Sequence, residues 1–168
     1  MIAAVPFLFS GIFLSRSIMV MLGLIKGPVL HSFEKYGDDE RGYNGLLYLL
    51  FWMGAFSLNS GIWMARLSRN VFLPMESLGV ILMAGAFIAY RQAHLVHKFF
   101  HYPRWYFELE ERTSRSERRR IAYMWLQLSR KGRLIYNSND FAFNQWADLI
   151  IVSTIYIDDY LEGQAASP

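Results

Sequence analysis

The sequence contains no cysteine, and charged residues make up only 18% of its 168 residues. The missing thiols exclude disulfide bonds, thiolate metal sites, iron–sulfur clusters and cysteine nucleophiles. Soluble domains carry about 25% charged residues, and here the deficit falls almost entirely in the N-terminal part of the chain. That distribution indicates helices in lipid rather than an unusually large soluble core.

Enzyme motifs are also missing. The sequence has no glycine-rich phosphate loop, no GxSxG elbow and no HExxH zinc motif. Two pairs of adjacent acids occur, at Asp38/Asp39 and Asp158/Asp159, but such pairs are usually solvated charge when nothing desolvates them. The sequence therefore favours a protein that is not itself an enzyme.

The sequence does contain three long apolar runs, Ile2–Ile25, Leu46–Ala65 and Leu73–Tyr90. A helix of about 20 apolar residues crosses the hydrocarbon core of a bilayer, which is about 30 Å thick. We therefore expect three spans, the first ending at Lys26-Gly27-Pro28 and followed by a polar loop over Gly27–Gly45. No positive charge precedes the first run, which argues against a cleavable signal peptide.

The third run leads into a basic and aromatic collar, so that the stretch Leu73–Phe107 connects the two halves of the chain. We expect one helix from Leu73 to His101, with Pro74 in its first turn and its end extending beyond the membrane. Trp105, Tyr106 and Phe107 would then form an aromatic belt among the lipid headgroups.

Small residues four positions apart recur in all three runs. In lipid such residues let helix backbones approach closely, so they are the predicted helix-packing positions. They are Gly11 and Ser15, Ser57 and Gly61, and Gly85 and Ala89.

Polar residues inside the runs need partners. They are Arg16, Asn59 and Glu76. An arginine at the centre of a span costs about 2.5–3.5 kcal/mol, so Arg16 either contacts protein or water or extends its guanidinium to the headgroups.

Charge is segregated in the C-terminal third of the chain. Between Arg112 and Arg133 seven Arg and one Lys accompany a single acid, Glu117, for a net charge of +7. From Leu134 onward there are five acids and no Lys or Arg, for a net charge of −5. The basic excess after the third run predicts a cytoplasmic C-terminus and an N-terminus outside.

The basic segment also has the period of an amphipathic helix over Ser116–Lys131, with Ser116 as N-cap and Gly132 as its stop. Arginines in its first turn oppose the helix dipole, so we expect an anion to compensate them. Anionic lipid, an acidic partner and the chain's own acidic tail are the alternatives, and nucleic acid is disfavoured. The candidate anion or partner contacts are Arg112, Arg115, Arg118, Arg119, Arg120, Arg130, Lys131 and Arg133.

A further apolar run, Phe141–Ile157, is interrupted by Asn144, Gln145 and Asp148. Its length and these polar residues favour a helix buried against the rest of the protein over a fourth short span. We expect a disordered tail from Gly163 to Pro168.

Histidines supply the one candidate metal site. His94, His97 and His101 share a helical face, and His31 falls on the same side of the membrane in a three-span topology. Imidazoles so placed can bind zinc, non-haem iron or haem iron. Amphipathic histidines at a headgroup boundary explain the same pattern without a metal, and we favour that interpretation.

Together these features predict an all-α integral membrane protein. It has three transmembrane helices with an interfacial collar over residues 1–107, and a cytoplasmic amphipathic helix and C-terminal helix over 108–168. We expect a non-catalytic accessory or structural subunit of a larger membrane complex, or a homo-oligomer, in the bacterial inner membrane. Its expected partners are lipids, anionic headgroups included, and other membrane subunits or itself. The alternative is a membrane redox protein that holds haem or a metal on the four histidines.

Overall fold

The computed structural model describes residues 4–36, 44–65, 69–92 and 102–165, and these ranges are helical with no strand. The helices are α1 (Ala4–Met21), α2 (Gly27–Tyr36), α3 (Gly45–Met64), α4 (Arg69–Arg91), α6 (Arg104–Arg112), α7 (Arg115–Gln127), α8 (Arg130–Ser138) and α9 (Asp140–Ala165). The predicted all-α class is confirmed.

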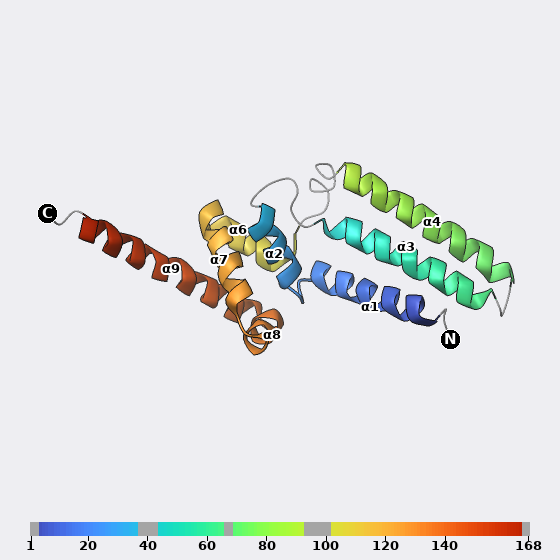
Figure 1. Cartoon of the computed structure of the whole chain (residues 1–168), viewed down its shortest axis with the longest axis horizontal. Coiled ribbons are helices and arrows are strands. Elements are labelled where there is room, and N and C mark those ends of the chain that lie inside the picture. Colours follow the sequence, from blue (N-terminus) through green and yellow to red (C-terminus); the bar gives the residue numbers. More distant parts are fainter. Residues whose placement is uncertain (1–3, 37–43, 66–68, 93–101, 166–168) are drawn as a thin grey trace. The chain divides into compact units, whose positions relative to one another are not determined.

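The chain divides into two compact units, which we name by their helices (Figure 1). The span unit comprises α1, α3 and α4, within Met1–Leu22 and Tyr43–Tyr102. The aromatic unit comprises α2 and α6 to α9, within Gly23–Gly42 and Pro103–Pro168. The chain therefore enters the aromatic unit twice, first directly after α1 and again after the third apolar run.

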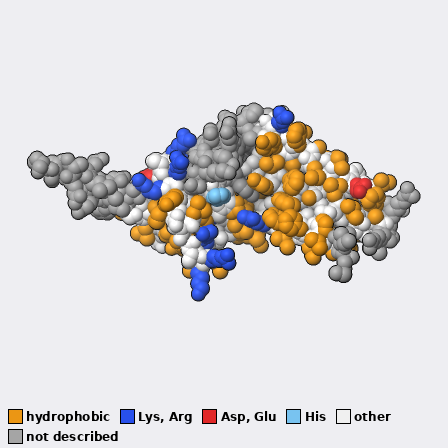
Figure 2. Space-filling view, in the orientation of Figure 1, with side chains coloured by type: hydrophobic (Ala, Val, Ile, Leu, Met, Phe, Trp, Pro, Cys, Tyr) orange, Lys and Arg blue, Asp and Glu red, His pale blue; other side chains and the backbone are white. Residues whose placement is uncertain are grey.

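In the span unit α3 lies between α1 and α4 and packs on both (Figure 1). Three helical segments are long and apolar enough to cross a membrane, as predicted: Ala4–Met21, Gly45–Met64 and Phe72–Arg91. Many of their large apolar side chains are exposed, and hydrophobic side chains are spread over the face of these helices that Figure 2 shows. Such a surface suits a lipid environment and not water.

Glycines bring α3 and α4 together. A Cβ atom on Gly54 would lie 2.7 Å from Met83 Cγ and 2.8 Å from the Gly79 carbonyl oxygen. One on Gly79 would lie 2.6 Å from Leu58 Cγ. No side chain fits at either position, so the two backbones approach as closely as glycine allows.

The first helix ends earlier than the sequence indicates. Gly23 has a φ of +78°, the left-handed conformation that terminates helices, and it follows Met21 by two residues. The predicted stop at Lys26-Gly27-Pro28 is therefore wrong. The third predicted helix ends at Arg91, and its predicted continuation through residues 93–101 lies outside the described residues.

The predicted polar loop after the first span is wrong over its first half. Residues Gly27–Tyr36 form α2, with Pro28 in the first turn, where its missing N–H costs nothing. Val29 and Leu30 are buried, and α2 packs on α7. Packing of this apolar pair explains why a polar-looking segment becomes a helix.

The aromatic unit takes its name from its core. Trp105, Trp125 and Phe143 are fully buried, and the Phe143 ring meets Trp105 and Trp125 edge-on at 5.1 and 5.7 Å between centroids. Trp105 and Tyr106 are therefore core residues, so the predicted headgroup belt is wrong for both. Phe107 is half exposed on the same helix.

The predicted helix Ser116–Lys131 is two helices. Ser114, not Ser116, is the N-cap of α7, and the chain turns at Leu128 before Ser129 caps α8. Gly132 lies inside α8 and does not stop a helix. A serine at the corner supplies an N-cap that outweighs the continuous period of the apolar stripe.

The last helix, α9, continues to Ala165, past the predicted start of the disordered tail at Gly163. Phe143 and Ala147 are fully buried, and α9 packs on α6, α7 and α8. The first turns of α9 are thus part of the aromatic unit, in agreement with a helix packed on the rest of the protein.

Candidate functional site: helix-end cations and the exposed face of α8

The basic segment contains a repeated corner motif. Ser114 to Arg118 and Ser129 to Arg133 both read Ser-Arg-x-x-Arg, and each follows the end of a helix. The serine side chain accepts a hydrogen bond from the backbone N–H three residues later, at Glu117 and at Gly132. The arginine one residue further on reaches back across the corner.

At the first corner Arg118 caps α6. Its guanidinium donates to the carbonyls of Glu110 at 3.2 Å and Thr113 at 2.7 Å, and the side chain is buried. The final carbonyls of a helix lack intrahelical partners and carry the negative end of the dipole. A cation there satisfies both needs.

At the second corner Arg133 does the same for α7. It donates from Nε to the Leu128 carbonyl at 3.0 Å and from a terminal nitrogen to the Leu126 carbonyl at 3.1 Å. Both corners thus have the sequence Ser-Arg-x-x-Arg, and in both the last arginine binds carbonyls at the end of the preceding helix.

The third corner, between α8 and α9, has Asn139 as cap and Phe143 where the other corners have arginine. Lys26 supplies the cation from a distant part of the chain. Its ammonium donates to the Asn137 carbonyl at 3.3 Å and to Asp140 Oδ1 at 2.5 Å. It also lies 5.4 Å from the centre of the Phe143 ring.

The surroundings of Lys26 form a closed site. Its side chain is 0% exposed, and a second ring, Trp105, lies 5.6 Å from the ammonium. Its backbone N–H also donates to Asn137 Oδ1 at 2.9 Å. A carboxylate, a carbonyl and two aromatic faces thus compensate the loss of water, and Lys26 ties the segment after α1 to the end of α8.

The eight cations predicted to contact an anion or a partner differ in what they bind within the chain. Arg118 and Arg133 bind backbone carbonyls, and Arg112 lies 3.3 Å from Asp148 of α9 in an exposed ion pair. Arg120 is exposed and has an interaction of its own. The other four are exposed and form no hydrogen bond or ion pair with any described residue: Arg115, Arg119, Arg130 and Lys131.

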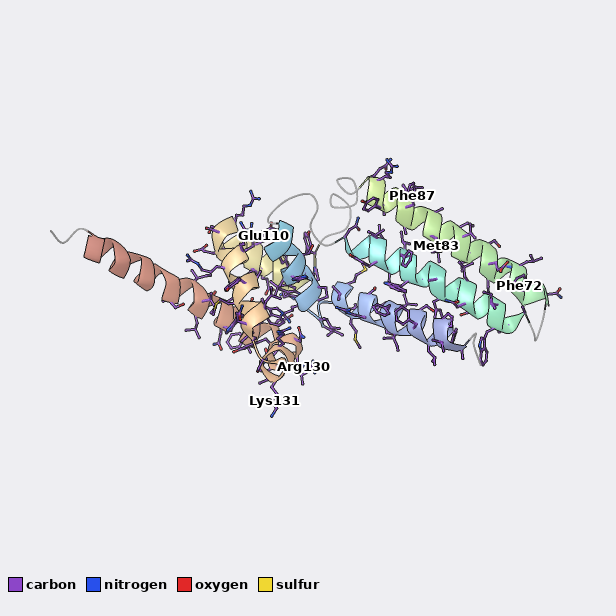
Figure 3. All side chains as sticks on the ribbon, in the orientation of Figure 1. Phe72, Met83, Phe87, Glu110, Arg130 and Lys131 are labelled. Atoms are coloured by element: carbon purple, nitrogen blue, oxygen red, sulfur yellow. The ribbon has the colours of Figure 1, made fainter. Side chains whose placement is uncertain are left out.

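Two of those four stand beside an exposed apolar surface. Leu134 and Ile135 of α8 are 71% and 58% exposed, and Arg130 and Lys131 project from the same helix (Figure 3). We call these four residues the α8 face. Arg133 and Asn137 of α8 lie toward the rest of the aromatic unit. Arg133 caps α7, and Asn137 binds Lys26.

A capping box holds the start of α7. Glu117 accepts hydrogen bonds from the backbone N–H of Ser114 at 2.6 Å and from its hydroxyl at 2.7 Å. These bonds stabilise the carboxylate, so the pKa of Glu117 lies below its ordinary value. Arg120 and Arg118 lower it further by their charge.

An open cleft of about 340 Å³ lies between α6 and α9. Phe141 is its one apolar lining residue, and Arg112 ion-pairs with Asp148 within it. The lining residues are Glu108, Glu111, Arg112, Phe141, Asn144, Gln145 and Asp148. Glu111 and Asp148 in this lining are exposed.

The span unit satisfies some of its polar residues and not others. Asn59 donates to the Ala55 carbonyl at 2.8 Å and to Ser10 Oγ of α1 at 3.3 Å, and Ser57 donates to the Met75 carbonyl of α4 at 2.8 Å. Arg16 is exposed and Glu76 is half-buried, and neither bonds to any residue that the structure describes.

The predicted packing residues take different positions. Ser57 and Gly61 are buried where α3 meets α4, Gly11 lies against Phe56, and Ser15 is exposed. Ala89 is also buried. The closest contacts between the helices come instead from Gly54 and Gly79. Neither glycine has a second small residue four positions before or after it, so the spacing rule does not find them.

The histidine site remains a prediction. His31 is exposed on α2, and His94, His97 and His101 lie outside the described residues. Within the described ranges no three His, Cys, Asp or Glu side chains gather closely enough to hold a metal ion. No protein-family model matches the chain, and neither the curated proteins nor the solved structures include a match to it.

Proposed function

We propose that the chain is a non-catalytic accessory subunit of a membrane complex, or a homo-oligomer, anchored by its three candidate spans. The observation that carries this proposal is the contrast among the polar residues of the span unit. Asn59 and Ser57 find partners within the unit, whereas Arg16 and Glu76 have none among the described residues. Charged groups in a span are costly, and a complementary helix of another subunit would stabilise both.

The position of each charge sharpens this proposal. Arg16 lies five residues before the end of α1 and Glu76 four residues after the start of the third candidate span, so each is about 6–8 Å from an end. The Glu76 Cγ lies beside Gly61, where the side chain is half-buried. Opposite charges at separate levels would set the depth and the orientation of a partner helix.

The test compares Arg16→Leu and Glu76→Leu with wild type in native membranes extracted with mild detergent. We expect wild type to run as an assembly larger than one copy, by native mass spectrometry, and each variant to lose the assembled form by about tenfold or more. The matched control is Ser77→Ala, because Ser77 is exposed beside Glu76 and bonds only within its own helix. Unchanged assembly in both variants would mean that the charges merely reach the headgroups.

We further propose the orientation with the C-terminus in the cytoplasm of a bacterial cell, from the net charge of +7 that follows the third apolar run. Reporter fusions at Asn70 and Pro168 should then report opposite compartments. The same compartment for both would overturn this topology.

A further inference from the structure

Helix α8 leaves two large aliphatic side chains, Leu134 and Ile135, exposed beside two cations. Arg130, Lys131, Leu134, Ile135 and Ser138 follow at i, i+1, i+4, i+5 and i+8 and so share one side of the helix, which is exposed. Arg133 and Asn137 are half-buried on the inward side, where their polar groups bind at the ends of helices. Leu134 and Ile135 are thus exposed on a helix whose inward polar groups already have hydrogen-bond partners.

We propose that the α8 face docks on anionic lipid headgroups, with Leu134 and Ile135 in the outer acyl region and Arg130 and Lys131 among the phosphates. This inference rests on the proposed function in one respect, that the spans hold the chain at a membrane. It goes further by assigning one element and one class of ligand.

The charge pattern selects that ligand. Helix α8 contains no acid, and Arg130 and Lys131 form no ion pair with any described residue. Cations flanking outward aliphatic side chains are the pattern of helices that lie in the plane of an anionic interface. Figure 3 shows Arg130 and Lys131 extending from α8 into open space.

The chain connection keeps α8 within reach of a bilayer. Lys26 follows the last residue of α1 by five positions, and five extended residues cover at most about 18 Å. The same lysine bonds Asn137 in the last turn of α8 and Asp140 just after it. The length of the chain between Met21 and Lys26 therefore limits how far the end of α8 can lie from the end of α1.

The size of the face argues against a protein partner. A stable protein interface buries about 1,200–2,000 Å² in total, far more than two aliphatic side chains on a nine-residue helix provide. A bilayer needs no such area, because the spans already hold the chain at its surface and docking is intramolecular.

The absence of cysteine allows single-cysteine variants of the full chain without background labelling. Leu134→Cys, Ser116→Cys and Phe87→Cys are each spin-labelled and reconstituted in nanodiscs of phosphatidylcholine, with or without phosphatidylglycerol. Collisions with oxygen, which is enriched in lipid, are compared with collisions with a water-soluble nickel chelate. Ser116 is an exposed control in α7, and Phe87 is exposed on a candidate span.

We expect the Leu134→Cys label to favour oxygen in anionic discs, the Ser116→Cys label to favour nickel in all discs, and the Phe87→Cys label to favour oxygen in all discs. Adding Arg130→Gln or Lys131→Gln should lower the equilibrium constant for docking about fivefold for each cation removed. A label at 134 that stays in water while the label at 87 is in lipid overturns the inference and leaves the proposed function standing. A label at 87 in water overturns the membrane anchorage itself.

Two further outcomes overturn the inference in other ways. Equal docking in neutral and anionic discs would remove the role of Arg130 and Lys131. Spin–spin broadening at position 134 in detergent without a bilayer would show that a second copy covers the α8 face instead of lipid.

Discussion

The two units of this protein differ in where their large apolar side chains lie and in which polar groups connect their helices. In the span unit Ser10, Ser17, Ser60 and Ser77 donate to carbonyls of their own helices, and large apolar side chains cover the outside. In the aromatic unit Trp105, Trp125 and Phe143 are buried, and cations connect the end of one helix to the next. This is the difference expected if the span unit lies in lipid, because lipid gives no hydrophobic drive to bury rings and offers no water to unpaired carbonyls.

The two units should therefore differ in how much a substitution of a polar residue lowers their stability. If the aromatic unit depends on cations at helix ends, then removing one should cost far more than removing a polar group of the span unit. Substitutions in the two units, taken from the largest expected effect to the smallest, test this contrast.

The largest effect is expected for Lys26→Ala. It removes a fully buried cation, leaves the Asn137 carbonyl without that donor and opens a cavity beside Trp105 and Phe143. We expect a loss of about 3 kcal/mol in the free energy of unfolding, measured by the near-ultraviolet circular dichroism of the full chain in mild detergent.

Two controls separate charge from volume at this site. Lys26→Met keeps most of the volume, and because Asp140 is 55% exposed and can rehydrate, it should cost about 1 kcal/mol less than Lys26→Ala. Lys131→Ala removes an exposed lysine and should stay within about 0.5 kcal/mol of wild type. Equal losses for Lys26→Ala and Lys131→Ala would refute a structural role for the buried cation.

The site of Lys26 also shows where prediction from sequence stops. The apolar runs predicted the three candidate spans, because length and composition alone decide whether a helix is able to cross a bilayer. The role of Lys26 depends on Asn137 and Asp140, more than a hundred residues away, and no local pattern records such a contact. For the same reason Trp105 looked interfacial although it is a core residue.

The corner motif, by contrast, was present in the sequence. Ser-Arg-x-x-Arg occurs at 114–118 and again at 129–133, and the repeat would have placed both N-caps and broken the apparent helix at Leu128. The period of Ile121, Trp125 and Leu128 suggested one continuous stripe instead. Periodicity measures which residues can share a face, whereas capping decides where the helix stops.

The next largest effect is expected for Gly54→Ala in the span unit. The added methyl would lie 2.8 Å from the Gly79 carbonyl oxygen and 3.1 Å from the Met83 backbone nitrogen, which cannot move aside as a side chain would. Forcing α3 and α4 apart should cost about 2 kcal/mol, measured by unfolding in a denaturing detergent. Gly85→Ala is the matched control, because its methyl would meet Leu50 at an ordinary 3.7 Å.

A smaller effect is expected for Ser114→Ala, which removes the N-cap of α7 and should cost about 1 kcal/mol. Ser116→Ala should cost less, because the Ser116 hydroxyl contacts only that of Ser114. A larger loss of stability for Ser116→Ala than for Ser114→Ala would mean that Ser116 is the N-cap, as the sequence pattern predicted.

The same cap gives a pH dependence with a definite sign. Because the pKa of Glu117 is lowered in the folded chain, its carboxylate stabilises the fold above about pH 4.3, the value of an unfolded glutamate. That contribution is lost as the pH falls from there through the lowered value. In Glu117→Gln the stability of α7 should vary less over this acidic range than in wild type, followed by the same unfolding measurement.

The smallest effect is expected for Asn59→Leu, although Asn59 forms more hydrogen bonds than any other side chain described in the span unit. Its amide donates to Ala55, Ser10 and Pro6, but hydrogen bonds between helices in lipid contribute only about 0.6 kcal/mol on average, since the separated helices also find partners. Ser60→Ala, which removes a bond within α3 alone, should be still closer to wild type. A loss for Asn59→Leu as large as that for Lys26→Ala would mean that the two units do not differ in what holds them together, because buried polar contacts would then stabilise both equally.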